Sequence, residues 1–330
     1  SACDQACAVV NCHAFDFTEM NAADACRLYP RNSAALIGAS GPQSRQFCYK
    51  PHALTQTDSD SLKSAIPVFW INLDREKERR AATERWLHGV PNTRIPAVTG
   101  KEMHAIVDGP HSEAVYDAIN QPVEAMSRSE RLALEAHPDM HHITCAITYS
   151  HLNAMAAAYE SGAETALIME DDNVFARPGA TWVDANRHMK HMLQNAPADW
   201  QVLQLFTSHS GAIQEIVQNK SRTPYFMPWN EYYGALAYLI NRSGMKQIID
   251  RFHVPAEDSS TRIWKLPAKT PQSDWMIYQN SKTYTSRVFL FNFANPGDKG
   301  SHGLDRKGRL FVIQQHISDR VASETVPELL

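Results

Sequence analysis

The chain has 330 residues, 43% of them hydrophobic and 21% charged, a globular composition that excludes a wholly disordered, collagenous or coiled-coil protein. Its 32 Lys and Arg residues against 36 Asp and Glu residues give a net charge of −4. Binding to a phosphate backbone needs a positive field, so nucleic acid is not expected as a partner. The longest apolar runs are broken by polar residues well short of a bilayer's thickness, which predicts no membrane span within this chain.

The cysteines are concentrated at the amino-terminal end. Five of the six lie within the first 48 residues: Cys3, Cys7, Cys12, Cys26 and Cys48. Such a tract favours disulfides made in an oxidising compartment, the lumen of the secretory pathway (Golgi or ER) or the exterior after secretion. Reduced thiols or a zinc site are the alternatives, and zinc is disfavoured because no tight CxxC pair is present. Cys145 is predicted to be a packed free thiol. The chain begins at Ser1 rather than Met, which is compatible with removal of a targeting or anchoring segment.

The composition divides the chain into two parts. Residues 1–60 are expected to form a Cys-rich segment and a polar linker, and residues 61–330 one α/β domain. Regular patterning starts with a buried strand over 66–74 (IPVFWINLD), followed by a charged helix over 75–87 and a short strand over 93–98. A strand–helix–strand order of this length predicts a parallel pair of strands.

Further elements follow in chain order. We expect a helical insertion over 101–142 and a helix over 143–160, whose many alanines suit close packing against a sheet. Apolar runs then predict strands, and amphipathic stretches predict helices. The strands are expected over 164–175, 200–206, 234–240 and 286–293, and the helices over 243–252 and from Asp274 onward.

Three adjacent carboxylates, Glu170, Asp171 and Asp172, stand at the end of an apolar run. They repel one another, so burying them is costly without a cation. In an extended chain Glu170 and Asp172 would point to one side and Asp171 to the other. Paired carboxylate oxygens suit Mn²⁺ or Mg²⁺, which would also hold a diphosphate. The alternative is a solvated acidic turn.

A second polar group follows the first predicted strand. Asn72, Asp74 and Arg75 end that strand, and Arg79 comes a turn later. Polar groups at a first strand–helix junction commonly meet a nucleotide, and arginine forks suit phosphate. Asp74 is also placed to cap the helix that follows, so we expect it both to cap and to bind.

Several separated blocks of the sequence together resemble glycosyltransferase family 25, which includes bacterial lipooligosaccharide galactosyltransferases and collagen hydroxylysine galactosyltransferases. The segments VFWINLDREKERR and IPAVTG are similar to the family's opening, and ITCAITYSHLNAMAAAYESGAETALIMEDDNVF is similar to its second block. The segments DWQVLQLF, YGALAYLINRSGMKQII and SDWMIY follow in the family's order. The matching blocks span roughly residues 66 to 280 and leave out the Cys-rich end.

The resemblance implies a GT-A-like fold: a Rossmann-like mixed sheet with helices on both faces. It further implies an inverting, metal-dependent transfer of galactose or glucose from a UDP-sugar to a hydroxyl of a glycan or protein acceptor, with Mn²⁺ or Mg²⁺ as cofactor. Two other interpretations stay open. One is a phosphohydrolase or nucleotidyltransferase that uses the same acids, and the other is a catalytically silent, secreted binding protein that keeps the fold.

The resemblance also assigns roles to single residues. Asp172 and Glu170 would hold the metal, and a larger set would contact the donor: Asn72, Asp74, Arg75, Arg79, Ser150, His151, Glu170 and Asp171. For Ser150 and His151 the alternative is a hydrogen-bonded pair in the core. Asp274, in the SDW segment, is expected to be the general base or to orient the acceptor, with a helix N-cap as the alternative.

An aromatic loop and the tail complete the candidates. Trp229 lies near Tyr225, Tyr232 and Tyr233, and this loop would either stack on a sugar or simply pack. His316 follows a short β-like run and is the favoured third metal ligand, as GT-A enzymes often recruit such a histidine. The rival is His302, which lies in a segment, 297–308, that also carries Lys299 and Arg306 and that we expect to act as a lid.

Overall fold

The computed structural model of the protein describes residues 14–17, 26–29, 46–49, 62–107, 140–176, 180–218, 225–255, 262–266 and 272–293. The helices are α3 (Lys77–Trp86), α4 (Gly100–Val107), α7 (Met140–Glu160), α8 (Trp182–Gln194), α9 (Ser210–Gln218), α10 (Arg242–Phe252) and α11 (Ser273–Gln279). The strands are β1 (Ala14–Phe17), β2 (Cys26–Tyr29), β3 (Gln46–Tyr49), β4 (Val68–Asn72), β5 (Asn92–Pro96), β6 (Thr165–Glu170), β7 (Asn173–Phe175), β8 (Val202–Gln204), β9 (Phe226–Pro228), β10 (Ala237–Asn241), β11 (His253–Val254), β12 (Ile263–Trp264), β13 (Thr283–Ser286) and β14 (Phe291–Phe293).

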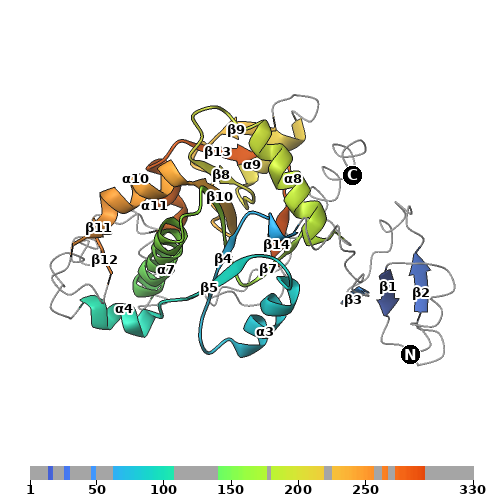
Figure 1. Cartoon of the computed structure of the whole chain (residues 1–330), viewed down its shortest axis with the longest axis horizontal. Helices are drawn as coiled ribbons and strands as arrows, with labels where there is room; N and C mark the ends of the chain where they lie inside the picture. The colour runs from blue at the N-terminus through green and yellow to red at the C-terminus, as the bar shows by residue number, and fades with distance from the viewer. Residues whose placement is uncertain are drawn as a thin grey trace.

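A mixed sheet of seven strands, in the order β5-β4-β6-β10-β8-β13-β9, lies at the centre of the molecule (Figure 1). The strand β4 pairs in parallel with both β5 and β6, as the strand–helix–strand pattern predicts. The strand β10 runs antiparallel between β6 and β8, and β9 pairs antiparallel with β13 at the edge. The predicted α/β fold with a Rossmann-like mixed sheet is confirmed.

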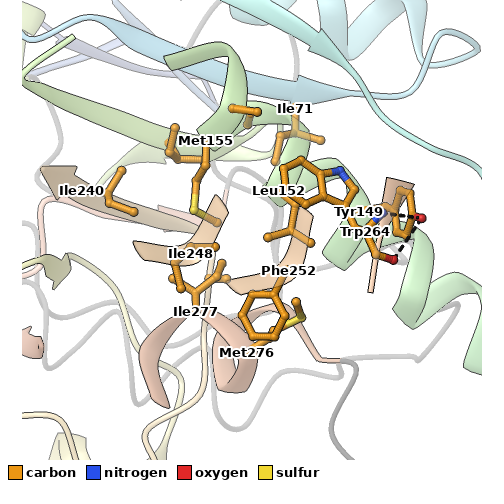
Figure 2. Packing of buried hydrophobic residues seen from close by; sticks show 14 of the residues in the cluster. Ile71, Tyr149, Leu152, Met155, Ile240, Ile248, Phe252, Trp264, Met276 and Ile277 are labelled. Carbon is orange, nitrogen blue, oxygen red and sulfur yellow. Dashed lines mark hydrogen bonds between the residues drawn. The ribbon is translucent and has the colours of Figure 1, made fainter. Parts of the chain in front are cut away.

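Side chains of the central strands alternate between two hydrophobic cores, because successive residues of a strand point to opposite faces. Phe69 and Ile71 pack with residues of α7, α10 and α11, as Figure 2 shows for Ile71, Ile248 and Ile277. The core on the other face contains Trp70 with residues of α8. Figure 1 accordingly shows α7, α10 and α11 on one side of the strands and α8 on the other.

The long helix α7 lies directly on the sheet because its buried face carries small side chains. Ala154 and Ala158 are fully buried there, and such residues let a helix approach a sheet closely. The Tyr149 hydroxyl accepts a hydrogen bond from the Trp264 backbone N–H at 2.9 Å and donates one to the Trp264 carbonyl at 3.1 Å (Figure 2). These bonds tie α7 to β12. The helix begins at Met140, three residues before the predicted start.

One sequence-based expectation for the strands is wrong. The strand predicted over 286–293 is not continuous: β13 ends at Ser286 and β14 begins at Phe291, because the Ser286 hydroxyl donates to the Val288 carbonyl and accepts from the Val288 N–H, which turns the chain. The strand β14 pairs with β7 instead of joining the main sheet. The strand predicted to run into the three acids ends at Glu170, and residues 171–172 form a turn between β6 and β7.

At the amino-terminal end, β1, β2 and β3 form an antiparallel sheet in the order β2-β1-β3. Residues 51–61 lie outside the described residues, so the boundary at residue 60 stays a prediction, as do the disulfides and the oxidising compartment. Cys145 is buried and free, and burial raises the pKa of its thiol to about 12, which confirms the predicted packed thiol. Within the described part of the chain, no helix is both long and apolar enough to cross a membrane.

Candidate active site

The polar residues singled out in the sequence meet at one edge of the sheet. In the strand register, Glu170 at the end of β6 lies beside Ile71 of β4, and Met169 lies opposite Ala237, the first residue of β10. The end of β4, the end of β6 and the loop that enters β10 are therefore neighbours. In open α/β sheets, ligands bind in the crevice at the carboxyl ends of the parallel strands, which is this edge.

On the side of β4 and α3, Asp171 is held by groups from both elements. The Asn72 side-chain N–H donates to Oδ2 of Asp171, and Nη1 of Arg79 lies 3.3 Å from Oδ1. The Thr83 hydroxyl donates to the Asp171 backbone carbonyl at 3.2 Å. Burial raises the pKa of the Asp171 carboxyl, and the Asn72 hydrogen bond and the Arg79 charge oppose that rise. Asp171 is thus the anchored member of the three acids.

Arg94, on β5, sets the orientation of Asn72. Its Nε donates to Oδ1 of Asn72 at 3.0 Å, and its Nη2 donates to the Asn72 carbonyl at 3.1 Å. Because the Asn72 amide oxygen faces Arg94, the amide nitrogen faces Asp171. Asn72 is 1% exposed, so this network is closed to solvent on its inner side. Sequence reasoning missed Arg94, since only the parallel register of β4 and β5 brings it to Asn72.

Asp74 does not cap α3, which corrects one part of the prediction. Its carboxylate bonds to Arg94 instead, and this hydrogen bond and charge lower the Asp74 pKa. The helix starts later than the sequence suggested: its N-cap position is Glu76, after a turn in which the Glu76 N–H donates to the Leu73 carbonyl at 2.9 Å. Arg75, whose side chain is 69% exposed, forms an ion pair with the neighbouring Glu76, with Nε 3.4 Å from Oε1.

On the side of α7, His151 is fully buried and faces Glu170. Its Nδ1 lies 3.2 Å from the Tyr238 hydroxyl, and its Nε2 lies 3.5 Å from Oε1 of Glu170. Ser150 is also buried: its hydroxyl donates to the Ala146 carbonyl at 2.7 Å and accepts from the Val98 N–H at 2.9 Å. Ser150 therefore fastens the segment after β5 to α7, while His151 reaches the acids.

Asp172 has the least compensated charge of the three acids. The alternation expected for an extended chain stops at Glu170, where β6 ends. Oδ1 of Asp172 is buried and has no hydrogen-bond partner within the described residues. Burial, followed by the charges of Glu170 and Asp171, raises the pKa of Asp172 to about 8. A carboxylate in this environment is stabilised either by a proton or by a cation.

Asp274 is the second residue of α11, whose N-cap position is Gln272, so the N-cap alternative does not describe it. Its Oδ2 accepts from the Gly234 N–H at 2.9 Å, and its Oδ1 accepts from the Trp275 N–H at 2.9 Å. Burial raises the pKa of this carboxyl, while the two backbone hydrogen bonds and the charge of His151 lower it. Asp274 thus lies within electrostatic range of the histidine that faces Glu170.

The chemistry of the donor set is compatible with a hard divalent cation. Glu170 and Asp172 supply carboxylate oxygens, the ligands that Mn²⁺ and Mg²⁺ prefer, and one oxygen of Asp172 is buried without a partner. Among the described residues, no group of three or more His, Cys, Asp or Glu side chains stands close enough to hold a metal by itself. The predicted ligand His316, its rival His302 and the expected lid over 297–308 all lie outside the described residues.

The fold and this edge define an α/β protein whose polar site lies at the carboxyl ends of a mixed, Rossmann-like sheet. The sequence pattern of the family described as "Glycosyltransferase family 25 (LPS biosynthesis protein)" matches residues 65–259, more than half of the chain. The chain belongs to glycosyltransferase family 25, which confirms the predicted family, and its sheet is consistent with the GT-A-like fold. No curated protein sequence matches the chain.

Proposed function

We propose that the chain is a metal-dependent, inverting glycosyltransferase that moves galactose or glucose from a UDP-sugar to a hydroxyl of a glycan or protein acceptor. Membership of the family supports sugar transfer from a nucleotide-sugar donor. The observation that carries the metal dependence is the buried, unpartnered Oδ1 of Asp172, beside two further carboxylates. A buried carboxylate without a partner is costly, and a bound cation would offset that cost.

Glu170 and Asp172 would hold Mn²⁺ or Mg²⁺, with His316 as the proposed third ligand. The ion would supply positive charge that stabilises the diphosphate leaving group. Asp171 has another task in this proposal, because Asn72 and Arg79 already occupy its carboxylate. It fixes the turn from which Asp172 projects.

Arg79 is the strongest candidate for a direct contact with the donor phosphates. Its side chain is 27% exposed, it lies at the first strand–helix junction, and it carries the planar fork that suits phosphate. Arg75 is more exposed and would contact the donor from the outer side of the same turn. Asn72 and His151 are fully buried, so they would act by positioning acids rather than by touching the nucleotide.

Asp274 is the proposed general base, or the residue that orients the acceptor. The acceptor hydroxyl would give its proton to the Asp274 carboxylate while its oxygen bonds to the anomeric carbon. The bond from that carbon to the UDP oxygen breaks, and UDP leaves with the electron pair. Burial supports this role, because a carboxylate whose pKa is raised is a better proton acceptor.

Release of UDP from UDP-galactose or UDP-glucose, with and without Mn²⁺, tests the proposal directly. Mn²⁺-dependent turnover supports it. A rise in melting temperature with UDP-sugar and Mn²⁺ but without turnover would instead support the alternative, a catalytically silent binding protein. If the chain neither binds nor turns over UDP-galactose or UDP-glucose under any metal condition, the transferase and the binding-protein assignments are both wrong. The donor must then be sought among other nucleotide sugars.

A further inference from the structure

The loop between β9 and β10 presents one aromatic ring to solvent beside the candidate active site. Tyr232 is buried, and the next residue, Tyr233, is 43% exposed. Within the described residues, the exposed large hydrophobic side chains are those of Tyr233 and Val174. The Tyr233 ring is therefore an isolated apolar surface among polar neighbours, and not part of a broad apolar patch of the kind that docks proteins.

The backbone beneath this ring is fixed by side chains from other elements. The Thr207 hydroxyl donates to the Tyr233 carbonyl at 2.7 Å. The Gln204 amide donates to the carbonyls of Tyr232 and Gly234, both at 3.1 Å. The Tyr278 hydroxyl donates to the Gly234 carbonyl at 3.0 Å, while Asp274 accepts from the Gly234 N–H. Strand β8, the segment after it, and helix α11 thus hold three consecutive peptide groups of the loop.

The loop is held in a conformation that it would not adopt by itself. Gly234 has φ +120°, and a Cβ at this position would approach the Thr207 Cα at 3.3 Å. Glu231 has φ 56°, the one non-glycine residue in the left-handed region among those described. Such backbone strain persists only where the surroundings enforce it, and it is concentrated at functional sites. Tyr233 lies between these two residues, and its side chain is exposed.

The neighbours of the ring suit a sugar. The His209 ring packs against Tyr233, with ring centroids 4.8 Å apart and an angle of 73° between the ring planes. Glu231 and Asn230, two and three residues before Tyr233 in the same loop, are exposed, and Glu231 offers a carboxylate to hydroxyl groups. An apolar ring flanked by hydrogen-bonding groups matches a pyranose, which has an apolar C–H face and a rim of hydroxyls.

We propose that Tyr233 is the platform on which a hexopyranose unit of the acceptor stacks, so that the acceptor is a glycan. This inference rests on the proposed transferase function. Gly234 follows Tyr233 directly, and its N–H is bonded to Asp274, so the stacking ring and the proposed base are linked through one peptide group. A sugar stacked on Tyr233 would therefore bind next to the backbone that Asp274 holds, and the hydrogen bonds that fix the backbone under the ring include the one to this carboxylate.

Saturation-transfer NMR on the full chain tests the platform, with methyl β-D-galactopyranoside and methyl β-D-glucopyranoside as probes. Wild type and Tyr233→Phe should both bind at least one probe, with the strongest saturation on the C–H protons of one sugar face. Tyr233→Ala should bind roughly 2- to 10-fold more weakly, the loss expected for one aromatic contact. Its melting-temperature rise with UDP and Mn²⁺ should equal that of wild type.

The outcomes separate the platform from the proposed function. Equal probe binding by Tyr233→Ala and wild type, or no binding of either probe to wild type, overturns the platform. A loss of the UDP-dependent shift in Tyr233→Ala also overturns it, because the ring would then serve the donor. If wild type binds a probe through Tyr233 but neither binds nor turns over UDP-sugars, the platform stands and the proposed donor chemistry fails.

Discussion

Asp171 and Asp172, adjacent in the turn after β6, lie in different surroundings. Asp171 is bonded to Asn72 and paired with Arg79, and Arg94 holds Asn72 in turn. The next residue, Asp172, has a buried oxygen without a hydrogen-bond partner among the residues that the structure describes. Neighbouring carboxylates in one sequence motif therefore have opposite environments. The compensated acid is suited to maintain the structure, and the uncompensated acid is suited to bind a cation.

The largest expected effect comes from removing the charge of Asp172, the acid that lacks a hydrogen-bond partner among the described residues. Asp172→Asn should abolish Mn²⁺-dependent UDP release while the protein stays folded, because Oδ1 of Asp172 has no hydrogen-bond partner among the described residues that the change would break. The melting temperature without metal should be unchanged or higher, and the rise caused by Mn²⁺ and UDP should disappear. Asp171→Asn is the matched control, since it removes the charge that Arg79 pairs with and should instead lower the melting temperature. Full Mn²⁺-dependent turnover in Asp172→Asn would refute its role as metal ligand.

Asp274→Asn should lower the transfer rate by roughly 10²–10⁴-fold if the carboxylate takes the acceptor proton. An Asn side chain retains an oxygen for the Gly234 N–H, so the loop should stay in place. Single-turnover rates, together with urea unfolding of both proteins, would measure this. A near-normal rate combined with a stability loss of about 1 kcal/mol would show instead that Asp274 has only a structural role.

The same variant gives a pH signature. Burial raises the Asp274 pKa above the ordinary 3.8, so the folded protein holds this proton more tightly than the unfolded chain does. The stability that Asp274 contributes is thus greatest at pH values below about 4 and is lost as the pH rises through the folded-state pKa. As the pH rises above about 4, the free energy of unfolding of wild type should fall relative to that of Asp274→Asn, and the difference should become constant above the folded-state pKa. Unfolding free energies at several pH values between 3 and 8 check this.

Arg94→Ala removes the hydrogen bonds that orient Asn72 toward Asp171, and it should affect mainly stability. It leaves the buried amide oxygen of Asn72 without a donor, and an unsatisfied buried group costs roughly 1–3 kcal/mol. Arg80→Ala is the matched control. Arg80 forms an exposed ion pair with Glu84, one turn further along α3, and such a pair is worth about 0.3–0.5 kcal/mol. Urea denaturation distinguishes them, and equal losses would mean that the Asn72 network is not a significant contributor.

The smallest expected effect comes from Thr83→Val, which keeps the side-chain shape but removes the hydroxyl bonded to the Asp171 carbonyl. The loss should be about 1 kcal/mol in the free energy of unfolding, the net worth of one hydrogen bond. The Mn²⁺-dependent rate should change little, because the turn is still held by Asn72 and Arg79. A large loss of activity with intact stability would show that the position of Asp172 depends on the Asp171 backbone more strongly than the contacts indicate.

The central strands and the acids could be predicted because their signals are local. The strands β4, β6 and β10 are short apolar runs bounded by polar residues, and Glu170 to Asp172 follow such a run directly. Helix α8 was not predicted, although the capping box formed by Thr181 and Asp184 could have indicated its start. The break at Ser286 depends on a side-chain turn that hydrophobic patterning does not detect.

The partners of the acids were less accessible to sequence reasoning, because tertiary register creates them. Arg94 reaches Asn72 across 22 residues, and Tyr238 reaches His151 across 87, and neither spacing has a signature in the sequence. The prediction that Asp74 caps the helix failed for a related reason. A capping residue and a strand-end residue look alike in sequence, and the turn before α3 decided between them.

Gly234 also bears on how this chain could be altered or could diverge. A side chain there would be strained, because φ is +120° and its Cβ would lie 3.3 Å from the Thr207 Cα, and the peptide groups around it are fixed by residues of other elements. The bonds run to backbone groups, so the loop's course does not depend on the side chain at position 233, where Tyr233 is exposed. That position is exchangeable on a constant frame, so a different recognition specificity could be installed there, by selection or by design, without rebuilding the sheet beneath it.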